Sequence, residues 1–267
     1  MKARHWDELN AALWKFVREP LMNEISRDAW FDTLKKSQIK KRGDMQTARC
    51  YTLNYSYMHF DALTKLINKQ LKPRLKPLRG RLLHIALGCG PGTDSWAVIR
   101  ALGKSVKVTT IGYDHNRNMI ALARNIAERI TKNESHKYEY FDDRDEFEER
   151  TADGKGRIAL VTINALFGQK TVTDEFVTWI VDLIDWLAER KTQVFVIGTH
   201  PDYDEEKVNE SWEQITELQG TCTIYEDRLD VRTWSATRYG EYHWSEEGPW
   251  HRGQFDPQSA RIIQARR

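Results

Sequence analysis

Three glycines stand close together at positions 88–92, which read Gly-Cys-Gly-Pro-Gly. Glycine has no side chain, so a turn rich in it lets the backbone approach a bound ligand closely. The preceding residues, 82–87, are Leu-Leu-His-Ile-Ala-Leu, a nearly continuous apolar run typical of a strand buried on both faces. Because ligands of open α/β sheets bind outside the carboxyl ends of the strands, the turn is predicted to be a ligand-binding loop.

A carboxylate follows the next apolar run. Asp114 comes 24 residues after Gly90, and a carboxylate is a good bidentate acceptor for a diol. The dinucleotide-binding fingerprint has its third glycine one residue later than Gly92, where this chain has Thr93. The spacing therefore disfavours a dehydrogenase. For the loop taken alone, a tight strand-to-helix turn without a ligand remains the alternative.

Two segments together carry a family resemblance. Residues 87–92, Leu-Gly-Cys-Gly-Pro-Gly, and residues 111–124, Ile-Gly-Tyr-Asp-His-Asn-Arg-Asn-Met-Ile-Ala-Leu-Ala-Arg, resemble the first two motifs of class I (Rossmann-like) S-adenosylmethionine-dependent methyltransferases. The resemblance spans roughly residues 80–200 and identifies no subfamily. It implies S-adenosyl-L-methionine as cofactor, with Asp114 accepting both ribose hydroxyls. The cofactor-binding residues that we derive from it are Gly88, Cys89, Gly90, Gly92, Asp94, Asp114, His115, Asp142, Asp143 and Asn164.

Polar residues at the ends of later strands are further candidates. The family often has an aspartate near the adenine amino group after the third strand; Asp142 and Asp143 both fit, and either can instead begin a solvated helix. Asn164 and His200 are the catalytic candidates, Asn164 for holding cofactor or substrate and His200 as a general base. A lone histidine at a strand end fits a structural role equally well. The signatures of enzymes that methylate base amines or cytosine carbon are absent from these strand ends.

One position departs from the family pattern. An acidic residue usually stands two positions before the first glycine, where this chain has Ala86. Asp94, at the start of the following helix, can compensate, since an acidic side chain suits a helix N-terminus. The alternative, which Ala86 supports, is a degenerate methyltransferase fold that acts as a binding or scaffold subunit within a protein complex.

The rest of the chain supplies the elements that position these residues. Apolar runs predict strands at 82–87, 106–113, 137–141, 157–164 and 193–198, which alternate with helices at 95–102, 119–130 and 173–190. This alternation predicts an α/β, Rossmann-like, mostly parallel sheet with helices on both faces. Residues 259–265 are expected to form a last strand. The aromatic residues between 234 and 255 either pack the final hairpin or stack a planar substrate.

Residues 1–79 are predicted to form a helical extension, and residues 80–267 the Rossmann-like domain. Helical spacing places helices at 5–18, ending near Pro20, then at 21–34 and at 45–71. Tyr51 and Tyr55 in the last of these are candidates for a lid over the cofactor, although their spacing also fits core packing. Tyr203 is a third substrate candidate.

Composition and charge set limits on the class of protein. Hydrophobic residues make up 40% and charged residues 30%, with no apolar run of membrane-spanning length and no apolar leader. Three distant cysteines argue against a disulfide framework or a zinc site and favour the cytoplasm. Residues 1–81 carry 18 Lys/Arg against 8 Asp/Glu. This excess suits RNA or another anionic partner as the methyl acceptor, a solvated helical face being the plainer interpretation and a small-molecule acceptor the rival one.

Overall fold

The computed structural model describes residues 11–24, 44–75, 80–103, 106–130, 136–164, 166–167, 172–201, 205–216, 223–229 and 258–265. These residues build a seven-stranded sheet of order β3-β2-β1-β4-β5-β7-β6. The strands are β1 (Arg81–Leu87), β2 (Lys107–Tyr113), β3 (His136–Phe141), β4 (Ile158–Ile163), β5 (Gln193–Pro201), β6 (Thr223–Leu229) and β7 (Gln258–Ala265). The pairs among β1 to β5 are parallel, and β7 lies antiparallel between β5 and β6. The predicted Rossmann-like α/β fold is confirmed.

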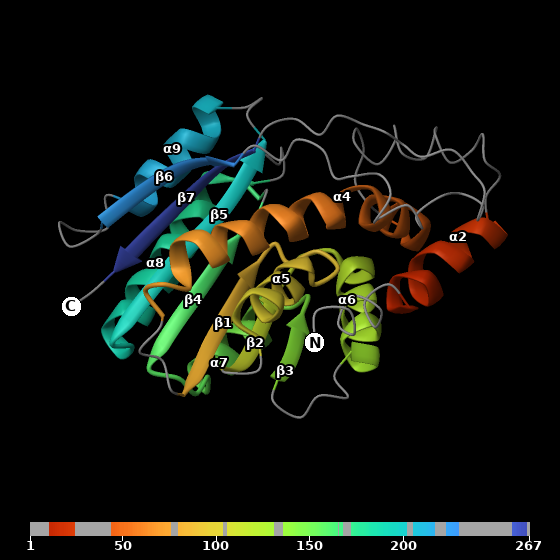
Figure 1. Ribbon diagram of the computed structural model, residues 1–267, viewed down its shortest axis with the longest axis horizontal. Helices are drawn as coiled ribbons and strands as arrows, with labels where there is room; N and C mark the ends of the chain where they lie inside the picture. Colours follow the sequence, from red (N-terminus) through yellow and green to blue (C-terminus); the bar gives the residue numbers. More distant parts are fainter. Residues whose placement is uncertain are drawn as a thin grey trace.

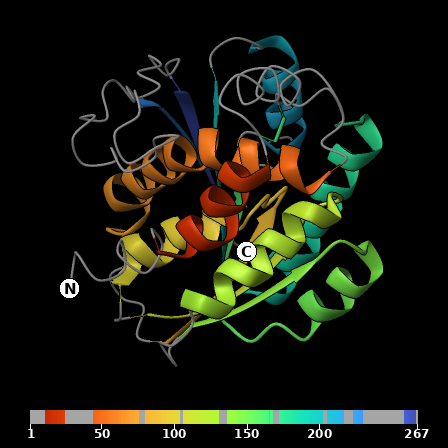
Figure 2. The same cartoon turned by 90° about the vertical axis from the view of Figure 1, so that its right-hand side faces the viewer.

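Helices cover both faces of this sheet, as Figures 1 and 2 show. One face carries α4 (Met45–Leu66), α5 (Thr93–Leu102) and α6 (Arg117–Ile130), together with α2 (Glu19–Glu24) and the π-helical turns η1 (Trp14–Arg18) and η2 (Ile67–Leu71). The other face carries α7 (Arg144–Ala152), α8 (Asp174–Arg190) and α9 (Glu205–Thr216). The alternating side chains of β1 explain this arrangement, since Leu82 joins one core cluster and Leu83 the other.

The N-terminal helices share a core with the sheet. Leu13, Leu21 and Leu63 belong to the same buried cluster as Leu82 of β1 and Phe195 of β5. The described part of the extension is therefore packed onto the sheet, and the boundary near residue 79 stays a prediction. No helix among the described ranges is both long enough and apolar enough to cross a membrane.

The predicted helix end near Pro20 is wrong, because the described helical segment continues through this residue to Glu24. Proline lacks the N–H that would bond to the carbonyl four residues earlier. That carbonyl belongs to Phe16, and it accepts instead from Nε of Arg49 on α4 at 3.1 Å. Just before the proline, the N–H of Glu19 bonds to the carbonyl of Trp14, which widens the turn. A distant side chain thus replaces the lost helical bond.

Candidate functional site

The glycine loop lies at the carboxyl edge of the sheet, where the strand order reverses between β1 and β4. Gly88, Gly90 and Gly92 all have positive φ angles, of 61°, 51° and 88°. A Cβ on Gly88 would lie 2.6 Å from Cδ1 of Leu166, and one on Gly92 would lie 2.7 Å from Oη of Tyr140. A Cβ on Gly90 would meet nothing within 4 Å. The outer two glycines therefore allow close packing, and the middle one faces open space where a ligand can approach.

The loop's backbone amides donate to the protein itself. The N–H of Cys89 bonds to the carbonyl of Tyr113 at 3.0 Å, that of Gly90 to Oδ2 of Asp114 at 2.9 Å, and that of Gly92 to the carbonyl of Cys89 at 2.9 Å. Pro91 has no N–H to offer. A phosphate-binding loop instead turns successive amides toward the anion. The amides of Cys89, Gly90 and Gly92 are therefore not available to a phosphate.

Asp114 connects the loop to β2 and to α6. Its Oδ2 accepts from Gly90, its Oδ1 accepts from the N–H of Asn116 at 2.9 Å, and the residue is 8% exposed. A carboxylate offers about four lone-pair sites, so about one per oxygen remains for a ligand diol. His115 Nδ1 lies 3.7 Å from Oδ1, and this imidazole is 73% exposed. Asp114 therefore occupies the place that the sequence predicted for a ribose-binding carboxylate.

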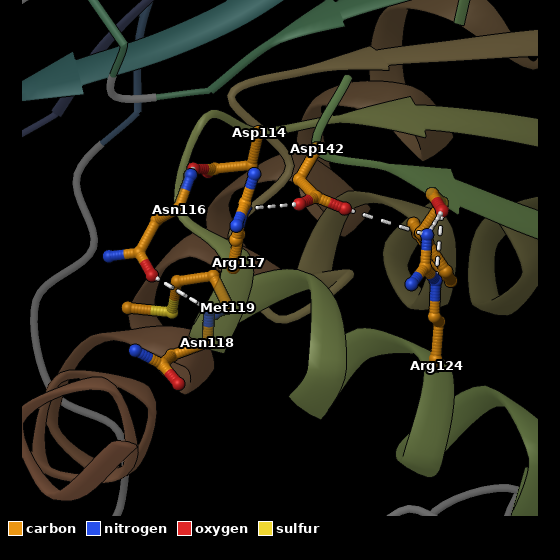
Figure 3. A network of polar contacts seen from close by, with 8 residues as sticks. Asp114, Asn116, Arg117, Asn118, Met119, Arg124 and Asp142 are labelled. Carbon is orange, nitrogen blue, oxygen red and sulfur yellow. Dashed lines mark hydrogen bonds and ion pairs between the residues drawn. The ribbon is translucent and has the colours of Figure 1, made fainter. Parts of the chain in front are cut away.

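The two aspartates after β3 have different surroundings, and Figure 3 shows one of them between two arginines. Asp142 lies 3.0 Å from Nε of Arg117 and 3.7 Å from Nη2 of Arg124, both on α6. Asp143 caps α7, because its Oδ1 accepts from the N–H of Glu146 at 3.0 Å. The expectation that one of the pair begins a helix is met by Asp143. An adenine contact stays a prediction for either residue, and Asp142 is the one left free of the cap.

Asp94, in the first turn of α5, is a buried carboxylate with one unsatisfied oxygen. It is 3% exposed, and Oδ2 has no hydrogen-bond partner. The hydroxyl of Thr162 and the amide of Asn164 hydrogen-bond to its side chain. Desolvation outweighs these two bonds and raises the pKa of Asp94 to about 7. Asn164 is held in turn by Thr199, whose hydroxyl donates to Oδ1 of the amide.

The position of Asp94 bears directly on Ala86. Thr162 is the register partner of Ala86 across the β1–β4 pair, and Thr162 bonds to Asp94. The carboxylate on the helix thus lies at the level of the sheet where β1 carries only a methyl group. The prediction that Asp94 compensates for Ala86 is untested, but the geometry it requires is present.

The other predicted site residues have different surroundings. The thiol of Cys89 packs inward with Ala86 and Tyr140, and burial beside Asp114 and Asp94 raises its pKa well above the ordinary value, so only its backbone faces the site. Tyr51 and Tyr55, on α4, pack against the hydrophobic core, and their ring centroids are 4.8 Å apart. His200 lies in β5, opposite Ser259 of β7. Tyr203 and the aromatic residues at 234–255 lie outside the described residues, as does the side chain of His200.

Several residues that support the site were not predicted from the sequence. His84 bonds through Nδ1 to Thr110 and through Nε2 to Thr162, each at 3.0 Å. The Tyr140 hydroxyl lies 2.9 Å from Oγ of Ser95 and fixes α5 beside Gly92. His84 carried a usable signal, since a histidine within an otherwise apolar run needs buried polar partners. Among the described residues, no cluster of three or more His, Cys, Asp or Glu side chains is arranged to hold a metal ion.

The basic residues at 69–81 that the structure describes lie away from this edge. Arg81 begins β1, whose far end carries the glycine loop about 20 Å away. Lys72 Nζ bonds to the carbonyl of Ala101, at the opposite end of α5 from Asp94. The other basic group, at residues 35–42, lies outside the described residues. The described basic segment is therefore not part of the candidate site.

Comparison with known proteins leaves the family open. No model of a protein family matches the sequence, and no curated protein matches it. Among solved structures, the plantazolicin methyltransferase BpumL in complex with SAH aligns at 11% identity over 90% of this chain and 97% of its own, with a TM-score of 0.49. A putative O-methyltransferase from Klebsiella pneumoniae aligns at 10% identity over 93% and 90%, with a TM-score of 0.45. These superpositions are too loose to carry an argument, and the fold assignment rests on the strand order.

Proposed function

We propose that the chain binds S-adenosylmethionine at the β1–β4 edge and is a methyltransferase. The observation that carries the proposal is the combination of a glycine loop whose amides at Cys89, Gly90 and Gly92 donate within the protein and an Asp114 carboxylate with acceptor sites left over. A nucleoside that carries an amino acid in place of phosphates matches both features. The motif resemblance points the same way.

The residues present fit this cofactor. Gly90 leaves open space beside the loop, and Asp114 can accept from a ribose diol. Asp142, beside the same edge, is our choice for the adenine amino group. When bound, S-adenosylmethionine supplies a methyl group on a positively charged sulfur, which is already activated for transfer. The protein's work is then to hold the acceptor in line, and positioning of this kind can account for about 7–11 kcal/mol of a barrier.

Asp114 is the residue on which to test the cofactor site. In Asp114→Asn, one oxygen becomes a donor, and loss of a charge-assisted bond to a diol weakens binding by about 1.5–3 kcal/mol, roughly 10- to 150-fold. Asp182→Asn, an exposed change on α8 behind the sheet, is the matched control and should bind normally. Calorimetric titration with S-adenosylmethionine and S-adenosylhomocysteine measures both affinities.

A scaffold subunit is the second candidate, favoured by Ala86. Failure of the folded wild-type protein to bind either ligand would reject the cofactor proposal and support this alternative. Binding without methyl transfer to any acceptor would leave a ligand-binding scaffold.

For the methyl acceptor we propose RNA or another anionic polymer, on the strength of the basic residues at 35–42. Binding of a generic RNA should weaken steeply between 50 and 200 mM salt, because phosphate contacts release counterions. Neutralising Lys40, Lys41 and Arg42 should reduce binding, whereas neutralising Lys69 and Lys72 serves as the control at the far edge. No binding at low salt would favour a small-molecule acceptor.

A further inference from the structure

The side chain of Tyr140 lies across the neighbouring strand of the sheet. Tyr140 stands on the edge strand β3, opposite Gly112 of β2, and Gly112 in turn stands opposite Ala86 of β1. A Cβ on Gly112 would lie 2.6 Å from Cδ1 of the Tyr140 ring and 2.9 Å from Cε1. The ring therefore occupies the space over β2 that a side chain at position 112 would fill.

The residues that surround this ring are small. Ala86, Cys89 and Ala123 share a buried cluster with Tyr140, which is itself only 3% exposed. Protein interiors are close-packed, so a bulky ring on one strand requires small residues on the strands that it crosses. This packing gives both Gly112 and Ala86 a structural reason, which is to make room for the phenol.

Polar contacts fix Tyr140 at its backbone and at its hydroxyl. Its carbonyl accepts from Nε and Nη2 of Arg124 on α6, at 3.0 and 2.7 Å, and its hydroxyl donates to Oγ of Ser95 on α5 at 2.9 Å. Ser95 is 0% exposed, and its own N–H donates to the carbonyl of Gly92 at 3.1 Å. The phenol is thus connected to the last glycine of the loop through one residue.

The phenol also packs directly against the loop. A Cβ on Gly92 would lie 2.7 Å from Oη of Tyr140 and 3.1 Å from Cζ. The N–H of Gly92 bonds to the carbonyl of Cys89, which closes the turn around Gly90. A displacement of the phenol would therefore change the loop at the turn that contains Gly90, where the backbone faces open space.

We propose that Tyr140 is a positioning residue for the ligand of the glycine loop: its phenol, reaching from the edge strand, holds the turn that keeps Gly90 open. The inference rests on the proposed function for the identity of that ligand. It requires no contact between Tyr140 and the ligand, because the side chain is buried in the cluster of small residues.

Three variants isolate the contribution of the hydroxyl. Tyr140→Phe keeps the ring and removes the bond to Ser95, and Ser95→Ala removes the same bond from α5. Tyr138→Phe is the matched control, because it makes the same chemical change on a ring that is stacked beside Tyr140, with centroids 6.5 Å apart. The double variant Tyr140→Phe/Ser95→Ala should show no larger effect than either single variant, since the two changes remove one bond.

The measurements are amide hydrogen exchange at Gly90 and Gly92 and calorimetric titration with S-adenosylhomocysteine. Loss of the bond should speed the exchange of these two amides by roughly 2- to 12-fold and weaken ligand binding by a similar factor. Tyr138→Phe should change neither. The titration is made at a temperature where every variant is fully folded, so that a loss of global stability alone leaves the affinity unchanged.

The two proposals fail in different ways. Ligand affinity equal to that of the wild-type protein in both Tyr140→Phe and Ser95→Ala overturns the positioning role and leaves the proposed function standing. Equal weakening in Tyr138→Phe overturns it as well. If Tyr140→Phe does not fold, Ser95→Ala decides. Wild-type protein that binds neither S-adenosylhomocysteine nor S-adenosylmethionine overturns the proposed function, and unchanged exchange at Gly90 and Gly92 in the variants would then overturn the hold of Tyr140 on the loop.

Discussion

Asp94 and Asp114 are both buried carboxylates at the carboxyl edge of the sheet, yet their surroundings differ. Asp114 accepts one backbone N–H on each oxygen, from Gly90 and from Asn116. Asp94 has hydrogen bonds from two side chains, and its Oδ2 has none. Each oxygen of Asp114 thus has a donor within the protein, whereas one oxygen of Asp94 has none.

The difference separates two ways of preparing a site. Asp114 is fixed by backbone amides, so it holds the glycine loop in place and has acceptor capacity left for a neutral diol. Asp94 is kept in surroundings that disfavour its charge, because burial outweighs the two hydrogen bonds to it. The first arrangement favours rigidity, whereas the second favours the protonated, neutral form of the acid.

The largest expected effect concerns the stability of the free protein at different pH values. The pKa of Asp94 is raised from 3.8 to about 7 on folding, so the folded state holds a proton that the unfolded state loses between these values. Stability contributed by Asp94 is therefore present at low pH and lost as pH rises toward 7. Relative to Asp94→Asn, the wild-type protein should lose about 3 kcal/mol between pH 5 and pH 8, measured by chemical denaturation.

His84 contributes equally to the pH dependence of stability in the wild-type protein and in Asp94→Asn. Its pKa falls from 6.5 to about 3 on folding, so its own contribution is lost as pH falls through this range, in both proteins alike. Equal pH profiles for the wild-type protein and Asp94→Asn would show that Asp94 is not held in its protonated form.

Gly90 and Gly92 of the loop allow a sharper comparison. Gly92→Ala combines a φ of 88° with a Cβ 2.7 Å from Oη of Tyr140, and it should lower the free energy of unfolding by about 2–3 kcal/mol. Gly90→Ala meets open space and should cost only about 1 kcal/mol while it obstructs the ligand. Thermal unfolding and ligand titration of both variants measure the contrast, and equal destabilisation would argue against the packing described for Gly92.

The smallest effect distinguishes the aspartates after β3. Asp143→Ala removes the cap of α7 and should cost about 1 kcal/mol of stability without affecting ligand affinity. Asp142→Ala breaks ion pairs with the exposed Arg117 and Arg124, which should change stability by less than about 1 kcal/mol. It should weaken binding of S-adenosylhomocysteine. The reverse pattern in affinity would assign the adenine contact to Asp143.

The parallel strands and the position of the glycine loop were predictable from the sequence. Each strand of the parallel part is a short apolar run, and the strand-then-glycine-loop order placed residues 88–92 and Asp114 at one edge of the sheet. These features depend on local pattern and on the handedness of parallel connections. The helix through Pro20 was not predictable in this way, because the compensating bond comes from Arg49, 33 residues from Phe16.

The state of Asp94 was also beyond the sequence. Thr162, which lies beside Asp94, also bonds to His84, 78 residues earlier in the chain. Only the β1–β4 register brings Thr162 and His84 together. The burial that raises the pKa of Asp94 depends on the packing of the complete fold around it. The basic excess before residue 81 does not by itself locate a binding surface, and its described part lies away from the loop.

The most direct test of the site is a parallel titration of the wild-type protein with S-adenosylhomocysteine and with NAD. The amides of Cys89, Gly90 and Gly92 already donate within the protein, so these three are not available to a pyrophosphate. S-adenosylhomocysteine is expected to bind and NAD to show no binding. Tight binding of NAD, or of NAD alone, would contradict the assignment of this edge to a nucleoside ligand without phosphates.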